Sequence, residues 1–346
     1  MSRVLNALLV FVPVAIALQL LGNLDLPVFI ASAIAIIPLA KLLGDSTEVL
    51  AGHYNPTAGA LLNATFGNAP EIFISIAAIS VGLPAVVLAS ITGSILGNVL
   101  LVLGMSLVAG GIRNKELKFE SFPFGLQASL LFIALTGLSV PYVFSIGTGR
   151  NVEFLSDTLA IVLISLYGLG LLFTFSTHKH LFAIPTRGND HPQWTVRRAL
   201  IILGGSTILA ALLSDILVGK INPVISALGV NQFFLGAVVI GIIGNVPEHL
   251  TAIQMALKNK ADIAIGIAAG SGAQVAIFVM PLIVLISELQ GRQLTMLFTP
   301  FELVGMFAAA LILMIVSYDG RSNWFEGVQL LAVYVILGAG FFFLLP

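Results

Sequence analysis

The chain has 346 residues, of which 58% are hydrophobic and 9% are charged, and its formal net charge is −1. Soluble domains carry about 25% charged residues, so this composition excludes an ordinary soluble domain and indicates an integral membrane protein. The chain contains no cysteine, which excludes disulfides, thiolate metal sites and cysteine nucleophiles. No cofactor and no nucleic-acid partner is expected.

Eleven apolar runs follow one another, each long enough for a helix across a hydrocarbon core ~30 Å thick. They cover approximately residues 4–21, 26–43, 57–81, 84–110, 122–144, 152–176, 196–218, 232–257, 262–287, 298–317 and 324–345. The alternating pattern of an outer-membrane barrel is absent, so the predicted fold is all-α. The first run could be read as a secretory signal, but Leu20, Leu21 and Asn23 replace the small residues of a cleavage site.

Lysine and arginine concentrate in every second interval between the runs. The intervals on the side of the N-terminus hold Arg3, Lys41, Arg113, Lys115, Lys118, Lys179, Arg187, Arg197, Arg198, Lys258, Lys260 and Arg321, whereas the opposite side holds Arg150, Lys220 and Arg292. The positive-inside rule therefore predicts a cytoplasmic N-terminus and an external C-terminus. The short N-terminal extension favours a prokaryotic plasma membrane over a vacuole.

A repeated motif divides the chain into two halves. Gly67-Asn68-Ala69-Pro70-Glu71 recurs 177 residues later as Gly244-Asn245-Val246-Pro247-Glu248, and Gly93-Ser94 recurs at the same offset as Gly270-Ser271. The predicted organisation is an N-terminal helix (1–24), a first five-helix repeat (25–176), a cytoplasmic linker (177–195) and a second five-helix repeat (196–346). Because five is odd, the second repeat is inverted relative to the first. Many secondary transporters have this architecture, with discontinuous helices that meet near the midplane.

The residues of each motif favour a broken helix with a charge at the break. Glycine lets the chain leave helical geometry, and proline either breaks a helix or lies in the first turn of a new one. Asn68 and Asn245 precede the prolines by two positions, where their side chains could cap a half-helix or face a ligand. An ionisable residue at membrane depth costs at least ~2.5 kcal/mol, so Glu71 and Glu248 are predicted to be functional and to be partners of each other.

Two carboxylates, amide oxygens and freed backbone carbonyls form an all-oxygen site, which suits Ca²⁺. The predicted metal ligands are Glu71, Glu248, Asn68, Asn245, Ser94, Asn98, Ser271 and Gln274. Simpler interpretations remain open for several residues: Ser94 and Ser271 could permit close helix packing, and His249 could relay protons or be a packed polar residue. Asp45, Glu48 and Asp215, which lie near helix ends, could form a cation-concentrating vestibule or be solvated interfacial charges.

Emptying this site would leave two carboxylates close together in a poorly solvated cavity. Burial and mutual repulsion both favour proton uptake there. The site would then hold a divalent cation or protons, but not both, and this competition is a mechanism for antiport.

The residues also carry a family resemblance. Residues 59–71 followed by Gly93-Ser94-Ile95-Leu96-Gly97-Asn98, and residues 244–249 followed by Gly270-Ser271-Gly272-Ala273-Gln274, resemble the two α-repeats of the calcium/proton exchangers, a branch of the calcium/cation antiporter superfamily. The resemblance covers essentially the whole chain. It implies Glu71 and Glu248 as shared ligands for Ca²⁺ and H⁺. The sodium-coupled branch typically has threonines where this chain has Gly67 and Gly244, which argues against Na⁺ as the counter-ion.

The sequence therefore predicts an antiporter that exchanges Ca²⁺, or other divalent cations, for H⁺ by alternating access. The alternatives are a Na⁺/Ca²⁺ exchanger and, from another class, a cation channel with the glutamates as a selectivity element. An enzyme is not expected, because the HExxH spacing of zinc proteases and recognisable nucleophile patterns are absent.

Overall fold

The computed structural model describes residues 2–22, 24–53, 62–63, 65–147, 152–178 and 194–343. The first half comprises α1 (Ser2–Ala7), the 3₁₀ turn η1 (Leu8–Val10), α2 (Phe11–Leu21), α3 (Asp25–Ala51), α5 (Ala69–Ser80), α6 (Pro84–Leu96), the π-helical segment η2 (Gly97–Val102), α7 (Leu103–Asn114), β1 (Leu117–Lys118), α8 (Ser121–Gly147), α9 (Val152–Leu172) and the π-helical segment η3 (Phe173–Thr177). Most of the predicted linker 177–195 lies outside the described residues.

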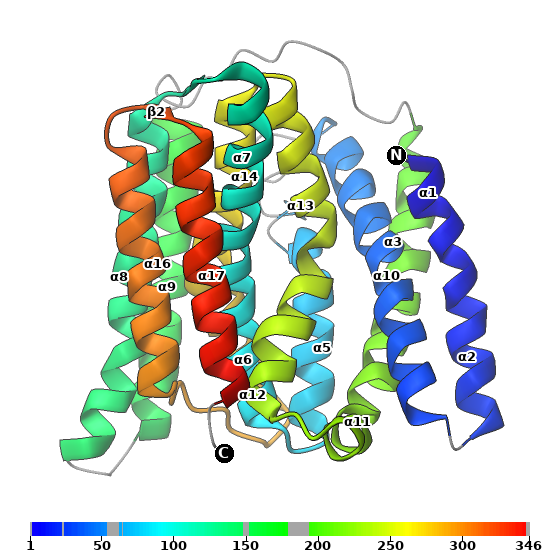
Figure 1. Ribbon diagram of the computed structural model, residues 1–346. Coiled ribbons are helices and arrows are strands. Elements are labelled where there is room, and N and C mark those ends of the chain that lie inside the picture. Colours follow the sequence, from blue (N-terminus) through cyan, green and yellow to red (C-terminus); the bar gives the residue numbers. More distant parts are fainter. Residues whose placement is uncertain are drawn as a thin grey trace.

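The second half is built from a similar series of helices. It comprises α10 (Val196–Gly219), α11 (Ile221–Leu228), α12 (Gln232–Phe234), the π-helical segment η5 (Leu235–Ile240), α13 (Gly241–Leu257), α14 (Ala261–Gln274), the π-helical segment η6 (Val275–Val279), α15 (Met280–Leu289), α16 (Pro300–Ser317), β2 (Arg321–Ser322) and α17 (Trp324–Phe343). The helices run roughly along one common direction (Figure 1). A short antiparallel pairing of β1 with β2 departs from the predicted all-helical fold.

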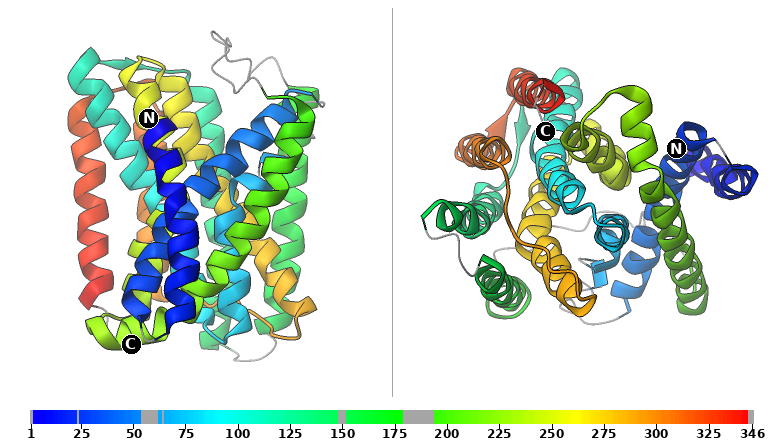
Figure 2. Two further views of the ribbon diagram at one scale, coloured as in Figure 1. Left: turned by 90° about the vertical axis from the view of Figure 1, so that its right-hand side faces the viewer. Right: turned by 90° about the horizontal axis from the view of Figure 1, so that it is seen from below.

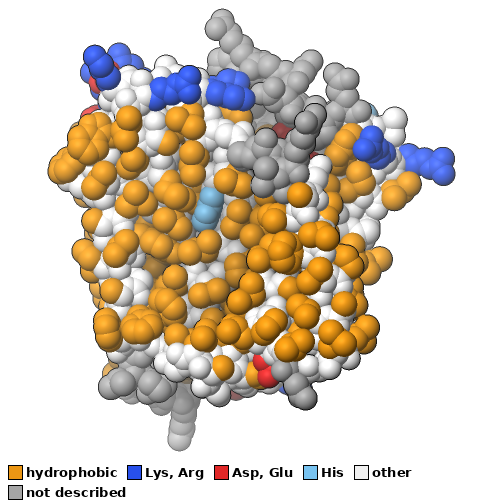
Figure 3. All heavy atoms as spheres, turned by 45° about the vertical axis from the view of Figure 1, so that its right-hand side comes forward, with side chains coloured by type: hydrophobic (Ala, Val, Ile, Leu, Met, Phe, Trp, Pro, Cys, Tyr) orange, Lys and Arg blue, Asp and Glu red, His pale blue; other side chains and the backbone are white. Residues whose placement is uncertain are grey.

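Nine helices within the described residues are long and apolar enough to cross a membrane. Two shorter apolar helices, Leu5–Leu21 and Ala69–Ser80, fall in the first and third predicted runs. On the face drawn in Figure 3, hydrophobic side chains cover most of the surface, and Lys and Arg side chains gather at one end. The protein is an integral membrane protein with an all-helical transmembrane part.

Contacts between distant loops define the two ends of the bundle. At one end, Lys118 pairs with Arg321 across the β1–β2 ladder, and Asp262 accepts a hydrogen bond from the Glu120 backbone N–H. At the other end, the Lys220 Nζ lies 2.8 Å from an Asp25 carboxylate oxygen, and Arg292 donates to the Ile79 carbonyl. We call these the basic end and the distal end. Figure 1 shows the N-terminus at the basic end and the C-terminus at the distal end.

The centre of the bundle is formed by α5, α6, α13 and α14, with α3 and α10 packed on one side (Figure 2). The α6–η2–α7 span is the most enclosed of the candidate membrane spans, since 94% of the most apolar stretch of Pro84–Asn114 is buried, and α6 is its first part. It crosses the start of α13 at Gly93 and Gly241, where the two backbones touch. A Cβ on Gly241 would lie 2.7 Å from the Gly93 carbonyl carbon, and one on Gly93 would collide with the Ala237 carbonyl. Close crossings of small residues are typical of membrane helices.

This crossing predicts that Gly93→Ala destabilises the protein. The added methyl group meets backbone atoms, which cannot move as a flexible side chain can, so a cost of at least about 1–3 kcal/mol is expected. Thermal unfolding in detergent should show a lower midpoint than the wild type. Gly125→Ala in α8 is the matched control, because a Cβ there meets nothing within 4 Å. An unchanged midpoint for Gly93→Ala would contradict this packing.

Candidate functional site

The first repeated motif interrupts the helical path at Asn68. This residue has φ −101° and ψ 20°, and α5 begins at Ala69 with Pro70 in its first turn, as predicted. Proline is tolerated there because its missing N–H would have no intrahelical partner. Of the two roles considered for the Asn68 side chain, capping the half-helix or facing a ligand, the capping hydrogen bond is not formed. Glu71 follows in the same turn and is buried, at the helix end that favours negative charge.

The second motif does not break its helix, and the prediction that it would was wrong. The α13 helix continues from Gly241 to Leu257 with Pro247 in its interior. Proline removes one hydrogen bond, the one that the Ile243 carbonyl would accept, but its fixed φ is close to the helical value. Contacts with α3, α6, α7 and α14 hold the surrounding turns in place. Prolines are tolerated in membrane helices for this reason. The two motifs therefore differ in shape despite their similar sequences.

The two motifs meet where Glu71 lies against Gly244. A Cβ on Gly244 would be 2.7 Å from Glu71 Oε1, so any larger residue would displace the carboxylate. Glu248 follows Gly244 by one helical turn along α13. The nearest atoms to a Cβ on Gly67, in contrast, belong to Asn63. The structure thus brings Glu71 and Glu248 together, as the repeat predicted, but in an asymmetric arrangement.

A hydrogen-bonded amide network joins the two halves beside the glutamates. Asn245 Nδ2 donates to Ser94 Oγ at 3.0 Å and to the Gly241 carbonyl at 2.9 Å. Asn98 Nδ2 donates to Asn245 Oδ1 at 3.0 Å and to the Ser94 carbonyl at 2.9 Å. The close crossing of Gly93 and Gly241 places these side chains within reach of one another. Three of the predicted ligands therefore converge, and the donors of both amides are used within the network.

Several acceptor oxygens at this position have no donor. Among the described residues, the buried atoms without a hydrogen-bond partner include Glu71 Oε2, Glu248 Oε2 and Asn98 Oδ1. Buried polar atoms are nearly always paired, so each exception needs an explanation. A cluster of acceptors that lacks donors is suited to a cation or to protons. The described residues contain no group of three or more His, Asp or Glu side chains that could hold a metal ion.

A cavity of about 600 Å³ leads to this cluster from the basic end. Glu248, Asn68, Ser271 and Gln274 line its inner part, together with Asn63 and Thr251. Glu71, Ser94, Asn98 and Asn245 are buried and are not among its lining residues. The predicted ligands therefore divide into four that line the cavity and four that do not. His249 is also buried and is not among the lining residues, and its Nε2 has no partner among the described residues.

The outer part of the cavity is charged. Asp45 and Glu48 line it, and Lys41 Nζ lies 2.6 and 2.7 Å from the two carboxylate oxygens of Asp45. Asp215 is exposed on α10 and is not among the lining residues, so the structure does not place it with the other two vestibule candidates.

Sequence reasoning did not assign Lys41, Asn63 or Asp262 to this cavity. Lys260 holds the N-cap position of α14, and Asp262, in the first turn, accepts a hydrogen bond from the Glu120 backbone N–H. The sequence did offer a signal that Asp262 belongs to the cavity, because this residue lies in the first turn of the helix that also carries Ser271 and Gln274.

Comparison with known proteins places this geometry in a family. The family model described as sodium/calcium exchanger protein matches residues 25–176 and 198–343. The Ca²⁺/H⁺ antiporter ChaA of Bacillus subtilis (strain 168) is 40% identical over 345 residues, which cover 97% of this chain and 98% of that protein. The Ca²⁺/H⁺ antiporter of Synechocystis sp. is 38% identical and covers 99% of this chain and 98% of its own.

Solved structures agree with these relatives. The structure of native YfkE superposes with a TM-score of 0.87 at 38% identity, covering 99% of this chain and 100% of that one. The H⁺/Ca²⁺ exchanger CAX has the same fold, with a TM-score of 0.78 at 14% identity over 98% of this chain and 91% of its own. Because the family model covers both halves and the relatives match nearly end to end, this chain belongs to the sodium/calcium exchanger protein family.

Proposed function

We propose that this protein is a secondary active antiporter that exchanges Ca²⁺ for H⁺ by alternating access, with Glu71 and Glu248 as ligands shared by both ions. The observation that carries the proposal is the cluster of buried, donor-free oxygens where the two motifs meet. Glu71 Oε2, Glu248 Oε2 and Asn98 Oδ1 contribute to it. Either a divalent cation or protons would neutralise the carboxylates there, and an empty, doubly charged site would be costly to bury. We assign the protein no enzymatic activity.

Relatives support this choice of ions. Both full-length relatives described above are named Ca²⁺/H⁺ antiporters. Gly244 supports H⁺ over Na⁺ on physical grounds, because the Glu71 carboxylate occupies the space that a threonine side chain at this position would need. The remaining predicted ligands, Asn68, Ser271 and Gln274, would complete the coordination from the cavity side. A Na⁺/Ca²⁺ exchanger is the second candidate, since sodium/calcium exchange gives the family model its description.

The proposal includes eleven transmembrane helices arranged as one N-terminal helix and two inverted repeats. The directions of corresponding helices support it. The α3 helix begins at the distal end near Lys220, whereas α10 ends there. The α6–η2–α7 segment ends beside Trp324 at the basic end, whereas α14–η6–α15 ends near Arg292 at the distal end. Both segments contain a π-helical stretch, at 97–102 and at 275–279.

The proposal also places the basic end in the cytoplasm of a prokaryotic cell, by the positive-inside rule. The cavity that reaches Glu248 opens at that end. In that orientation the protein would be open to the cytoplasm, with Glu248 lining the cavity and Glu71 outside its lining.

The first prediction from this proposal concerns the two carboxylates. Glu71→Gln and Glu248→Gln should each abolish Ca²⁺ uptake into proteoliposomes under an imposed pH gradient, because an amide neither exchanges protons nor carries charge. Glu302→Gln is the control. Glu302 is also buried, but its oxygens accept hydrogen bonds from Thr92 at 3.2 Å and from the Thr299 N–H at 2.8 Å. The Glu302→Gln protein should keep its transport activity. Exchange that survives Glu71→Gln would refute the shared site.

The second prediction concerns the counter-ion. Ca²⁺ uptake should follow an imposed pH gradient and should not follow an imposed Na⁺ gradient at equal pH. Because protons and Ca²⁺ compete for the same carboxylates, acidification on the side of Ca²⁺ entry should raise the apparent KM for Ca²⁺. Uptake driven by Na⁺ alone would instead establish the second candidate, and channel-like conductance without counter-transport would exclude both.

The third prediction concerns the vestibule. Asp45→Asn leaves Lys41 unpaired at the mouth of the cavity, so the apparent KM for Ca²⁺ should rise by about two- to fivefold, the range of partly exposed charge interactions. The effect should shrink at high ionic strength. Asp215→Asn is the control and should leave KM unchanged, because this carboxylate lies outside the cavity lining. Equal effects of both variants would show that the cavity mouth has no special role.

A further inference from the structure

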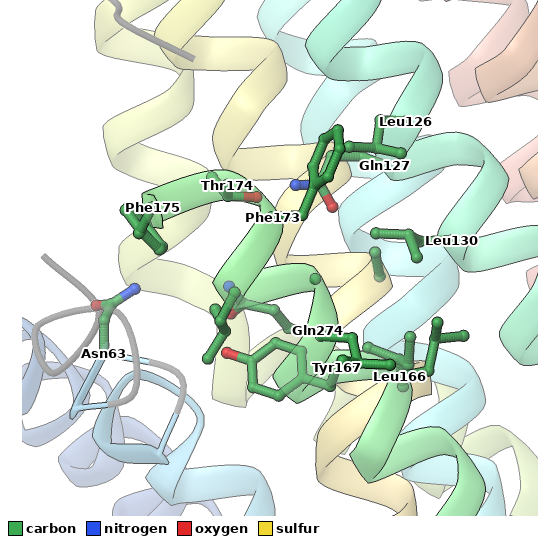
Figure 4. Close-up of a pocket in the computed structure, with 15 residues that line it drawn as sticks. Asn63, Leu126, Gln127, Leu130, Leu166, Tyr167, Phe173, Thr174, Phe175 and Gln274 are labelled. Atoms are coloured by element: carbon green, nitrogen blue, oxygen red, sulfur yellow. The ribbon is translucent and has the colours of Figure 1, made fainter. Parts of the chain in front are cut away.

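A second cavity, of about 510 Å³, lies between α8, the α9–η3 helix and the α14–η6 helix (Figure 4). None of its lining residues is charged. Most of the lining is apolar, and five neutral polar side chains also contribute, namely Asn63, Gln127, Tyr167, Thr174 and Gln274. The volume falls in the range of about 300–1,000 Å³ typical of small-molecule sites.

Tyr167 gives this cavity an unused hydrogen-bonding group. Its side chain is 91% buried, since its relative exposure is 9%. Its ring packs against Phe278, with centroids 4.9 Å apart, and its hydroxyl has no hydrogen-bond partner among the described residues. Buried tyrosine hydroxyls usually have a partner. In Figure 4 this hydroxyl points toward the side of the cavity where Asn63 lies, whereas Leu126 and Leu130 lie on the opposite side.

The cavity opens onto the apolar surface of the helix bundle. Leu169, at its rim, is 62% exposed within the candidate membrane span Val152–Thr177. Only 11% of the most apolar stretch of that span is buried, so α9 is a peripheral helix. A ligand can therefore enter from the surrounding lipid.

We propose that this cavity binds an uncharged single-chain amphiphile of the monoacylglycerol type. Its acyl chain would lie along Leu126, Leu130 and Leu166, and its glycerol hydroxyls would pair with Tyr167 and the neighbouring amides. A charged head group is disfavoured because the lining offers no opposite charge. This cavity adjoins the charged one, because Asn63 and Gln274 line both, but its other lining residues are not shared. The proposal does not depend on which ions the protein exchanges.

Photolabelling of the full chain in phosphatidylcholine liposomes tests this site. The probe is a monoacylglycerol with a diazirine in its acyl chain, and mass spectrometry identifies the labelled residues. Labelling should concentrate on cavity-facing positions of α8 and α9, and excess unlabelled monoolein should suppress it. Leu130→Trp fills the cavity and should reduce this labelling at least fivefold. Ile133→Trp is the matched control, because Ile133 is 50% exposed on the same helix and does not line the cavity.

Tyr167→Phe keeps the shape of the cavity and removes only the hydroxyl, so it tests the proposal even if Leu130→Trp fails to fold. Loss of one neutral hydrogen bond should weaken competition by monoolein about two- to tenfold. Equal labelling of wild type and a folded Leu130→Trp protein would overturn the proposal, as would unchanged competition in Tyr167→Phe. Equally efficient labelling of the cavity by a diazirine phosphatidylcholine would overturn the assignment to an uncharged head group.

Discussion

Two carboxylates that each keep one buried oxygen without a hydrogen-bond partner among the described residues are the constraint on which the rest of this structure depends. Glu71 Oε2 and Glu248 Oε2 lie among apolar helices, where an uncompensated charge is strongly destabilising. The nearby amides do not relieve this, because Asn98 and Asn245 direct their N–H groups to Ser94, Gly241 and each other. In the proposed mechanism, a bound cation or protons supply this compensation, and transport exchanges one for the other.

The helix architecture leaves these carboxylate oxygens without donors and controls access to them. The crossing at Gly93 and Gly241 brings the two halves into backbone contact and sets the amide network in place. The chain break at Asn68 directs Glu71 toward Gly244, while the continuous α13 presents Glu248 to the cavity. One carboxylate is thus accessible from the basic end and the other is enclosed. Two motifs of nearly equal sequence occupy different environments, as a transporter open to one side requires.

The sequence was sufficient for features that rest on composition and internal symmetry. Apolar run lengths indicated the candidate spans, and the repeat predicted that the two motifs meet, as Glu71 and Gly244 do. The repeat marked Ser94 and Asn245 as candidate ligands but did not predict the hydrogen bond between them. Three-dimensional packing decided the rest. Pro247 predicts a break by local rules, but neighbouring helices keep α13 continuous. Lys41 reaches the cavity through helix placement, which no local pattern encodes, whereas Asp262 had a sequence signal in its position at the start of the helix that carries Ser271 and Gln274. In the sequence, Tyr167 cannot be distinguished from any other aromatic residue of a membrane helix. Only the structure shows that its hydroxyl lies at a cavity and has no hydrogen-bond partner among the described residues.

The most direct test of the shared site is the number of protons released when Ca²⁺ binds. Purified protein in weakly buffered detergent solution is titrated with Ca²⁺ while pH and bound Ca²⁺ are followed together, over a series of starting pH values. The account predicts that binding releases protons and that the release per bound Ca²⁺ falls as the starting pH rises and the carboxylates lose their protons beforehand. Saturable Ca²⁺ binding without proton release at every pH would contradict it.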